Sequence, residues 1–327
     1  MKKNALLALL SLFTVTFGWP EEVVSPAPAT TVPDAAARAS RPPANTHGVD
    51  MRTQADPAGT ARYSPPLPLD ATLPTFWLIG DSTVRNGSAG DGTNLNQWGW
   101  GAPLTFFFDA QKVNVVNRAL GGTSARSFYN GNWKAMVELI KTGDTVIMQF
   151  GTNDGGAPAT SVGELRGIGE ETSEITNRAG KSETVHTFGW YLRQIIAETR
   201  AKGATPIVCS LIPRKSWDEQ KHIKRAHDTF AGWAGQAAAA EKVGFIDLNE
   251  LIARRLDVLG KEKVDLLYVP NPTPEKPGGE TVHPGWDGAV INAEVVVSGL
   301  KALGAKNPVG AYFSARASTV AAATTLP

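Results

Sequence analysis

The amino-acid sequence predicts a three-layer α/β/α sandwich around a five-stranded parallel sheet. Five short runs rich in Val, Ile and Phe recur along the chain, and continuous apolar content at this length is typical of strands buried on both faces. Segments with apolar residues at helical spacing alternate with these runs. Alternating strands and helices build a parallel sheet covered on both sides, and ligands of such sheets gather at the carboxyl ends of the strands.

The strands are expected at Thr75–Gly80, Val113–Arg118, Asp144–Phe150, Ala204–Ser210 and Val243–Leu248. One helix is expected from His186 to Lys202, before a break at Gly203, because six residues recur there at helical spacing: Phe188, Tyr191, Leu192, Ile195, Ile196 and Thr199. A last helix is expected to run to about Leu303. The polar stretch Ser161–Thr184 is too long for a plain connection and is expected to be an inserted loop that shapes a cleft.

The amino-acid composition limits the classes of protein to which the chain can belong. With 327 residues, of which 42% are hydrophobic, the chain can build a sizeable core. Lys plus Arg (32) nearly balances Asp plus Glu (31), and no basic block is interleaved with aromatic residues, so no nucleic-acid partner is indicated. Cys209 is the only cysteine, which excludes an intramolecular disulfide, and its apolar neighbours predict a core residue rather than a nucleophile.

The chain divides into four expected regions. Residues 1–19 carry Lys2 and Lys3 before an apolar run that is too short to span a bilayer, which indicates a signal peptide and a secreted or periplasmic protein; an uncleaved anchor is the alternative. Residues 20–72 hold ten of the 22 prolines, all between Pro20 and Pro68, which favours a disordered linker. The folded domain is expected at 73–304, followed by a surface tail at 305–327. The mature chain is expected to have no transmembrane span, and its oligomeric state is open.

The first run ends in Gly80-Asp81-Ser82-Thr83, which places a serine where a strand gives way to a helix. The hydroxyl of Ser82 would lie at the positive end of the helix dipole, a suitable place for a nucleophile. The alternative is a helix N-cap, because Asp and Ser are also preferred capping residues.

Residues suited to stabilising negative charge follow the second and third runs. Gly122 lies in Gly121-Gly122-Thr123-Ser124, and Asn153 lies in Gly151-Thr152-Asn153-Asp154. Ester cleavage builds negative charge on the carbonyl oxygen, and a glycine N–H, an asparagine amide and the N–H of Ser82 can donate to it. Taken singly, each motif also fits an ordinary turn or loop.

The segment Glu280-Thr281-Val282-His283-Pro284 precedes the last expected helix. Pro284 suits a first helical turn, so His283 would face the strand ends as a general base, with an acid three residues earlier to accept from its other ring nitrogen. The alternative is a surface loop histidine. The remaining histidines have no partners at metal-ligand spacing, so a metal site is not indicated.

Together the four segments resemble the SGNH (GDSL-like) hydrolase superfamily, named for a Ser, Gly, Asn and His in this order. The stretches 117–127, 150–156, 186–192 and 210–214 are similar to its rhamnogalacturonan acetylesterase branch, and the likeness covers about Phe76 to Leu303. The resemblance implies a flavodoxin-like fold and a two-step acyl-enzyme route without metal or organic cofactor. It implies Ser82 as nucleophile, His283 as base and acid, and Ser82, Gly122 and Asn153 as oxyanion donors.

The sequence departs from the family pattern at one position, because Glu280 stands where the family has Asp three residues before the histidine. A longer side chain can still deliver a carboxylate to the imidazole if the backbone recedes. Asp287 and Asp265 are weaker substitutes, and some family members are expected to work with little more than a Ser-His pair.

Several flanking residues are candidates for a substrate surface. Trp98 and Trp100 lie among glycines and could stack on sugar rings, although core packing is the alternative for at least one of them. Four basic residues could pair with the carboxylate of a uronic acid, or be solvated surface residues: Arg85, Arg126, Arg214 and Lys215.

These features predict an exported serine esterase that deacetylates a plant cell-wall polysaccharide, foremost acetylated rhamnogalacturonan. The alternatives are another SGNH ester hydrolase, such as an acetylxylan esterase or a lysophospholipase-like enzyme, and a non-catalytic carbohydrate-binding protein, favoured by Glu280 and the nine tryptophans. A nucleotide-binding domain shares the strand pattern but has a glycine loop for phosphate where this chain has Gly80-Asp81-Ser82-Thr83.

Overall fold

A computed structural model of the chain describes residues 67–85, 97–268 and 278–324. The chain divides into two units, Met1–Ala39 and Ser40–Pro327, and every described residue belongs to the second. The signal peptide expected at 1–19 and most of the linker expected at 20–72 lie outside the described residues. The domain boundaries therefore stay predictions.

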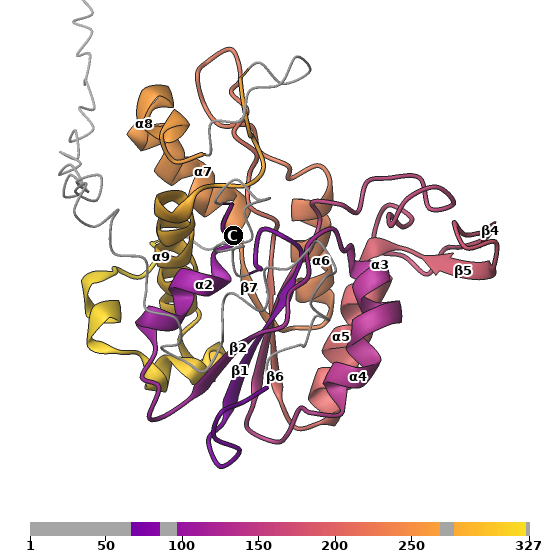
Figure 1. The fold of residues 1–327 in the computed structure, drawn as a ribbon, viewed down its shortest axis with the longest axis horizontal. Coiled ribbons are helices and arrows are strands. Elements are labelled where there is room, and N and C mark those ends of the chain that lie inside the picture. Colours follow the sequence, from indigo (N-terminus) through magenta and orange to yellow (C-terminus); the bar gives the residue numbers. More distant parts are fainter. Residues whose placement is uncertain (1–66, 86–96, 269–277, 325–327) are drawn as a thin grey trace, which may run out of the picture. The chain divides into compact units, whose positions relative to one another are not determined.

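The centre of the described part is a five-stranded sheet in the order β2-β1-β3-β6-β7, and all neighbouring strands are parallel (Figure 1). The strands are β1 (Thr75–Gly80), β2 (Asn114–Asn117), β3 (Thr145–Gln149), β6 (Thr205–Cys209) and β7 (Gly244–Ile246). Each lies within one of the five expected runs, so the prediction of the sheet is confirmed. Leu78 pairs with Ile147, and Ile147 with Ile207, which stacks apolar side chains across the middle of the sheet.

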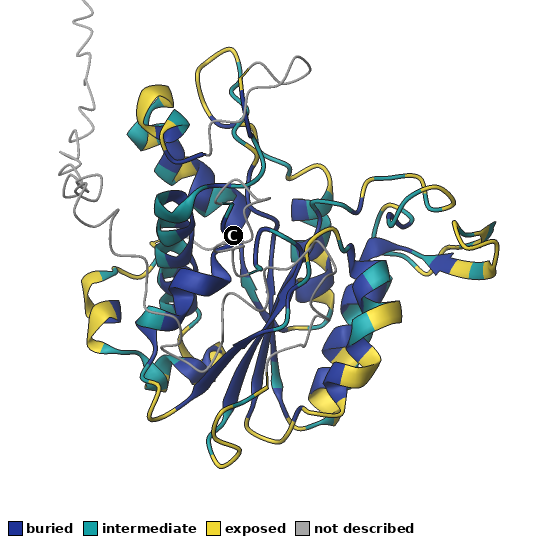
Figure 2. Ribbon diagram, in the orientation of Figure 1, coloured by how far each residue is buried: buried dark blue, intermediate teal, exposed yellow. Residues whose placement is uncertain are grey.

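Helices cover both faces of this sheet, which confirms the three layers (Figure 2). Side chains alternate along β1, so that Phe76 and Leu78 pack into one apolar cluster and Trp77 and Ile79 into the other. The first cluster is closed by α2 (Gly101–Leu104), α7 (Leu248–Leu259) and α9 (Trp286–Ala302). The second is closed by α3 (Ala125–Phe128), α4 (Lys134–Val137), α5 (Phe188–Ala201) and α6 (Phe230–Ala240). Cys209 is buried in the first cluster, and burial raises the pKa of its thiol.

The expected helix at His186–Lys202 is α5, and all six residues predicted on its apolar face are buried. Thr187 caps it, since its side chain accepts a hydrogen bond from the backbone of Trp190. The polar stretch before it is not a plain loop. It contains an antiparallel hairpin of β4 (Thr172–Thr176) and β5 (Ser182–His186), which the sequence did not reveal because these strands carry few apolar residues.

The C-terminal segment corrects another expectation, since its described part packs on the domain instead of trailing along the surface. Three short 3₁₀ turns follow α9: η4 (Gly304–Lys306), η5 (Pro308–Tyr312) and η6 (Ala315–Thr319). Val309 and Ala317 are buried, and Phe313 packs against Phe108 with ring centroids 5.1 Å apart. These apolar contacts hold the segment on the domain, although its sequence has only weak hydrophobic periodicity.

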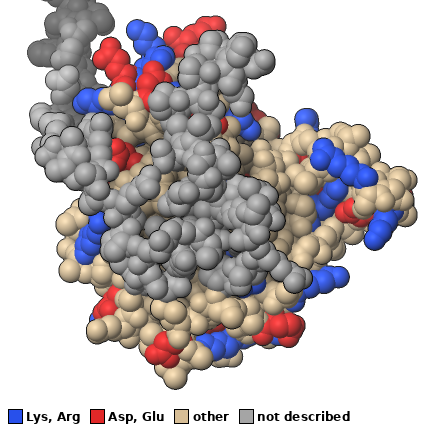
Figure 3. Space-filling model, in the orientation of Figure 1, with Lys and Arg blue, Asp and Glu red and all other residues tan. Residues whose placement is uncertain are grey.

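The surface of the described residues carries both charges. Lys, Arg, Asp and Glu side chains are interspersed on the face drawn in Figure 3, as the net charge of +1 would suggest. Among the helices in the described ranges, none combines the length and apolar content that a membrane crossing needs.

Asp144 joins the starts of β1 and β3, and its removal should destabilise the domain. Its Oδ1 accepts from the N–H of Thr75 (2.8 Å) and its Oδ2 from Nε1 of Trp77 (2.9 Å), all in buried surroundings. Asp144→Ala leaves these donors without an acceptor, at about 1–3 kcal/mol each. We expect the free energy of unfolding, measured by urea denaturation, to fall by about 3 kcal/mol. Asp144→Asn keeps one acceptor and should lose less; an Ala variant as stable as the wild type would contradict the interpretation.

Candidate active site

The nucleophile candidate lies in a tight turn at the end of β1. A Cβ at Gly80 would lie 2.4 Å from the carbonyl oxygen of Gln149, and its φ is +154°, so only glycine fits there. The turn is closed by bonds from the N–H groups of Val84 (3.2 Å) and Arg85 (3.1 Å) to the carbonyl of Asp81. Residues 81–85 form turns, so the helix expected directly after Ser82 does not begin within this stretch, and 86–96 lie outside the described residues.

A direct contact joins Ser82 to His283, although 201 positions separate them in the sequence. The Oγ of Ser82 lies 2.8 Å from Nε2 of His283, and both side chains are half-buried. This is the distance at which an imidazole can take the proton of a hydroxyl group. The structure thus brings together the two residues on which the predicted chemistry depends.

Glu280 lies on the other side of the imidazole, but its geometry is loose. Its Oε2 is 3.4 Å from Nδ1 of His283, and Nδ1 has no hydrogen-bond partner among the described residues. The carboxylate instead folds back onto its own turn, where Oε1 accepts from the N–H groups of Thr281 (2.8 Å) and Val282 (2.7 Å). Burial acts to raise the pKa of Glu280, but the Val282 N–H and the His283 ring together hold it below its ordinary value.

The two weaker candidates for the acid lie on helices α8 (Lys261–Asp265) and α9. Asp265 forms ion pairs with Lys215 (3.1 Å) and Lys261 (2.5 Å). Asp287 lies in the first turn of α9. A residue that sequence reasoning missed, Gln97, donates from Nε2 to Oε2 of Glu280 at 3.1 Å. No motif signals Gln97, because only the fold brings it to Glu280.

The imidazole of His283 is kept neutral by its surroundings. Burial lowers its pKa from the ordinary 6.5, and the positive charges of Arg85 and Arg214 act in the same direction. Glu280 opposes them without reversing the shift. At neutral pH the ring is therefore unprotonated, which is the state a general base needs.

The expected oxyanion donors surround the same turn. Gly122 is exposed with φ +76°, and none of the described residues accepts a hydrogen bond from its N–H or from that of Ser82. Asn153 donates from Nδ2 to the carbonyl of Thr123 at 2.9 Å, which uses one of its two amide hydrogens and leaves the other. The N–H of Leu120 donates to the carbonyl of Gly80 at 2.9 Å. These bonds hold the Gly122 and Asn153 loops beside the Ser82 turn.

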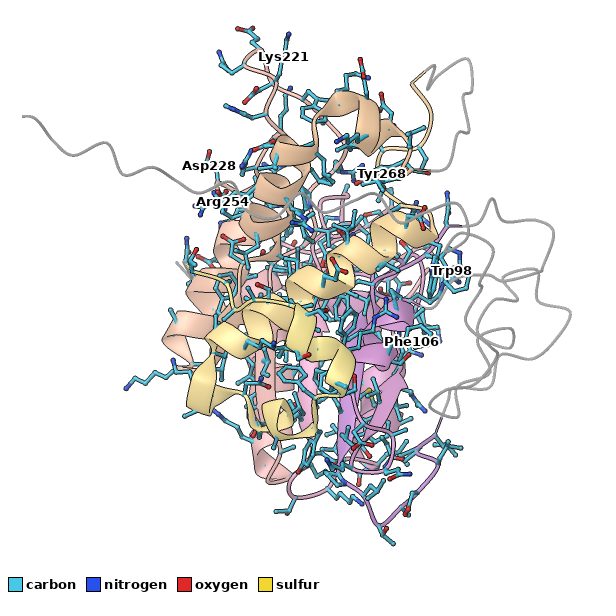
Figure 4. The ribbon with its side chains drawn as sticks, turned by 90° about the vertical axis from the view of Figure 1, so that its left-hand side faces the viewer. Trp98, Phe106, Lys221, Asp228, Arg254 and Tyr268 are labelled. Atoms are coloured by element: carbon cyan, nitrogen blue, oxygen red, sulfur yellow. The ribbon has the colours of Figure 1, made fainter. Side chains whose placement is uncertain are left out.

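The two tryptophans expected at a substrate surface are buried, which corrects that prediction. Trp100 is fully buried and donates from Nε1 to Oε1 of Gln149 at 2.7 Å, so its ring supports the sheet. Trp98 is 5% exposed and packs edge-on against Trp286, with centroids 4.9 Å apart. Phe106 contacts Trp286 as well and lies on the same side of the domain as Trp98 (Figure 4).

The expected basic residues divide into two groups. Arg126 is 5% exposed and donates to the carbonyls of Gly163 (2.5 Å) and Pro158 (3.1 Å), so it fixes a loop and its assignment to substrate is wrong. Lys215 likewise has a protein partner, because its Nζ forms an ion pair with Asp265. Arg214 is exposed with Nη2 3.4 Å from the carbonyl of Thr152, and the guanidinium of Arg85 lies against Gly121. The last two arginines therefore flank the loops that carry Asn153 and Gly122.

No group of three His, Cys, Asp or Glu side chains suited to a metal ion occurs in the described ranges. The ring of His227 instead contacts a single carboxylate, since its Nε2 lies 3.0 Å from Oδ2 of Asp247.

Comparisons with known proteins identify the family to which the chain is similar. The pattern described as the GDSL-like lipase/acylhydrolase family matches residues 78–290. A rhamnogalacturonan acetylesterase of Emericella nidulans is 31% identical over 215 residues, which are 65% of this chain and 82% of the relative. A probable rhamnogalacturonan acetylesterase of Bacillus subtilis, YesY, is 30% identical over 230 residues, covering 70% and 93%. The crystal structure of the B. subtilis protein YxiM superposes with a TM-score of 0.56 and 27% identity, over 72% of this chain and 58% of that one.

The shifted pKa of His283 can be measured directly. We expect its ring to titrate below 6.5 in an NMR titration, with the signal assigned by its loss in His283→Asn. Arg214→Gln removes a neighbouring positive charge and should move the pKa of His283 upward. Arg200→Gln, at an arginine that pairs with Glu241, is the matched control and should leave it unchanged. A wild-type value at or above 6.5 would show that burial does not control this ring.

Proposed function

The chain belongs to the GDSL-like lipase/acylhydrolase family, and we propose that it removes O-acetyl groups from acetylated rhamnogalacturonan through an acetyl-Ser82 intermediate. The relatives place it in the rhamnogalacturonan acetylesterase-like branch of the SGNH superfamily, as a serine ester hydrolase. The observation that carries the proposal is the 2.8 Å contact between Ser82 Oγ and His283 Nε2, next to loops that present N–H donors.

In the first half-reaction Ser82 Oγ attacks the carbonyl carbon of the acetyl group while His283 Nε2 takes the hydroxyl proton. The negative charge that develops on the carbonyl oxygen is stabilised by the N–H groups of Ser82 and Gly122 and by the free amide hydrogen of Asn153. When the bond from the carbonyl carbon to the sugar oxygen breaks, His283 gives its proton to that oxygen. The sugar hydroxyl leaves, and the acetyl group stays on Ser82.

In the second half-reaction a water molecule takes the place of the sugar. His283 removes a proton from the water as the resulting oxygen attacks the acetyl-Ser82 carbonyl, and the same donors hold the oxyanion. Acetate leaves when the ester bond to Ser82 breaks, and His283 returns the proton to Oγ. The carboxylate of Glu280 stabilises the imidazolium that forms in both halves.

The charges around the site support an acidic polymer as substrate. Arg85 and Arg214 both raise the positive potential at His283, whereas the carboxylate of Glu280 is already bound by backbone N–H groups and Gln97. A guanidinium pairs with a carboxylate in a planar fork. This favours a galacturonate-containing chain over neutral xylan or a lipid. Export through residues 1–19, to a secreted or periplasmic location, belongs to the same proposal and is supported by the sequence alone.

The substrate is tested by measuring the acid released from three esters: acetate from the two acetylated polysaccharides and fatty acid from a lysophospholipid. We expect the highest kcat/KM on acetylated rhamnogalacturonan, a lower value on acetylated xylan, and none on a lysophospholipid. Added salt should weaken the preference for the acidic polymer, because it screens the exposed Arg214. Equal rates on xylan and rhamnogalacturonan would contradict the assignment of substrate while leaving the esterase intact.

The nucleophile is tested with Ser82→Ala, which should lower kcat by about 10³-fold or more while the far-UV circular dichroism stays that of the wild type. A serine-directed phosphonate should label the wild type once, at Ser82, and leave the Ala variant unlabelled. Absence of labelling together with retained polysaccharide binding would favour a binding protein on this scaffold.

The contribution of Glu280 is tested with Glu280→Gln, which keeps an oxygen for the Thr281 and Val282 N–H groups but removes the charge. Because its carboxylate is 3.4 Å from Nδ1 in poor hydrogen-bonding geometry, we expect kcat to fall by about 10- to 100-fold, less than for a well-bonded triad acid. Asp265→Asn is the control and should stay near the wild-type rate. A larger loss in the Asp265 variant would place the acid there.

A further inference from the structure

A group of aromatic side chains beside the catalytic turn has no part in the proposed chemistry. Trp286 is the first residue of α9, three positions after His283, and its ring is contacted edge-on by Trp98 (centroids 4.9 Å apart) and by Phe106 (6.3 Å). Trp98 is buried beneath, whereas Trp286 and Phe106 are partly exposed. We call these three residues the Trp286 patch. Trp98 and Trp286 belong to neither of the two apolar clusters that cover the sheet, and a separate apolar patch at a protein surface is typical of a binding site.

The Trp286 patch is continuous with the catalytic turns. The N–H of Trp98 donates to the carbonyl of Pro284, directly after His283, at 2.9 Å, and the N–H of Trp100 donates to the carbonyl of Thr83, directly after Ser82, at 3.0 Å. The stretch 98–100 is therefore bonded to both halves of the Ser-His pair. From Trp98 the same side of the domain continues to Phe106 (Figure 4). A polymer whose ester lies at Ser82 can extend along this side.

Arg316 adds an exposed positive charge to the patch. Its Cζ lies over two aromatic rings, 5.6 Å from the centroid of Phe106 and 5.1 Å from that of Phe107. Within the described ranges its guanidinium has neither a hydrogen-bond acceptor nor an ion-pair partner. Glu294 on α9 is near enough to feel its charge, but that carboxylate has Arg255 of α7 as its ion-pair partner at 3.9 Å. The fork of donors on Arg316 is therefore available to the carboxylate of a ligand.

The C-terminal segment fixes Arg316 in this place. Ser314, two residues earlier, is bonded to the backbone of η2 (Thr105–Phe107) through its N–H (2.9 Å) and its Oγ (2.8 Å). On the other side, Nζ of Lys301 donates to the carbonyl of Ala317 at 2.6 Å. The backbone that carries Arg316 is thus held on both sides without an acidic partner for its side chain. Such preorganisation lowers the entropy lost when a ligand binds.

We propose that the Trp286 patch and Arg316 form a subsite for the acidic polysaccharide chain on one side of the acetyl ester that Ser82 cleaves. The C–H face of a sugar ring packs on Trp286 and Phe106, and the carboxylate of a uronic acid pairs with Arg316. The indole N–H of Trp286 meets no acceptor within the described ranges and is not buried, so it donates to a sugar hydroxyl. The subsite rests on the proposed function, since it assigns to the same substrate a contact region outside the ester.

Binding is measured with Ser82→Ala as the parent, because this variant holds the ester without turning it over. The probe is an acetylated rhamnogalacturonan oligosaccharide, titrated calorimetrically. In this parent we expect Arg316→Gln to raise Kd about threefold to fivefold and Trp286→Ala to raise it about tenfold. Arg200→Gln, at an arginine in the last turn of α5 that pairs with Glu241, is the matched control and should leave Kd unchanged. An unchanged Kd in the Arg316 and Trp286 variants overturns the proposal.

The same oligosaccharide with its carboxylates reduced to alcohols isolates the contribution of charge. Arg316→Gln should bind this neutral probe as the parent does, whereas Trp286→Ala should weaken the binding of both probes. Added salt should remove the effect of Arg316→Gln on the acidic probe, because an exposed ion pair is screened. If Arg316→Gln weakens the acidic and the neutral probe equally, the arginine recognises no carboxylate and the proposal is wrong.

Kinetics separate a subsite from a ring that merely positions the neighbouring His283. p-Nitrophenyl acetate is too small to reach from Ser82 across the Trp286 patch. We expect Trp286→Ala to lower kcat/KM on the acetylated polymer at least fivefold more than on this small ester, mainly through KM. Trp286→Phe keeps an aromatic face and should recover most of the loss. Equal losses on both esters would show that Trp286 acts through His283 and would overturn the subsite.

The outcomes for the subsite and for the proposed function are distinguishable, because the titrations need no turnover. A wild type that binds the oligosaccharide through Trp286 and Arg316 but releases no acetate contradicts the proposed function and leaves the subsite standing. An enzyme that deacetylates the polymer equally well as wild type, Arg316→Gln and Trp286→Ala keeps its function and loses the subsite. Failure of the Ser82→Ala parent to bind the acidic oligosaccharide overturns the subsite as well.

Discussion

The close approach of β1 and β3 at Gly80 and Gln149 is the contact on which the site depends. Because Gly80 has no side chain, the carbonyl of Gln149 can lie where a Cβ would otherwise be, and the chain can turn at once into Asp81 and Ser82. The side chain of Gln149 then joins this turn to the core, since its amide donates to Thr83 and accepts from Trp100. Thr83 in turn donates to Asp81, whose pKa is raised to about 6 by burial. The direction of the Ser82 hydroxyl is thus fixed by a network that runs back into the sheet.

Charge is distributed around this turn in two layers. Buried carboxyl groups lie on the inner side, where Asp81, Asp154 and Glu164 are all shifted toward the neutral form by burial. Arg85 and Arg214 lie on the outer side, where their positive charges add to the burial that lowers the pKa of His283. A neutral base and a positive rim suit a reaction that begins with proton abstraction and passes through an oxyanion. A protonated carboxyl group carries no negative charge. The inner carboxyl groups therefore do not cancel the positive potential of the two arginines while they are protonated.

Much of the fold could be predicted from the sequence because its signals are local. Continuous apolar runs define the strands, and the spacing from Phe188 to Thr199 defines α5. The placement of Ser82, Gly122, Asn153 and His283 near one edge follows from the parallel sheet. What could not be predicted depends on packing between distant segments. Trp100 and Arg126 look like substrate contacts in sequence, yet one binds Gln149 and the other binds loop carbonyls. The β4–β5 hairpin lacks an apolar run, and Gln97 acquires its role only from Glu280, which the fold brings next to it.

The turn around Glu280 explains how Glu, whose side chain is one methylene longer than that of Asp, can occupy this position. Its carboxylate accepts from Thr281 and Val282, so the extra methylene lets the side chain bend back and stabilise its own loop. The orientation of His283 then comes largely from the backbone on either side: the N–H of Lys215 donates to the carbonyl of Thr281 (2.7 Å), and the N–H of Trp98 donates to the carbonyl of Pro284 (2.9 Å). With the ring held in this way, the carboxylate need only supply charge at 3.4 Å. A Ser-His pair held by its backbone can tolerate a distant acid, because orientation, which a triad acid normally provides, is supplied by the fold.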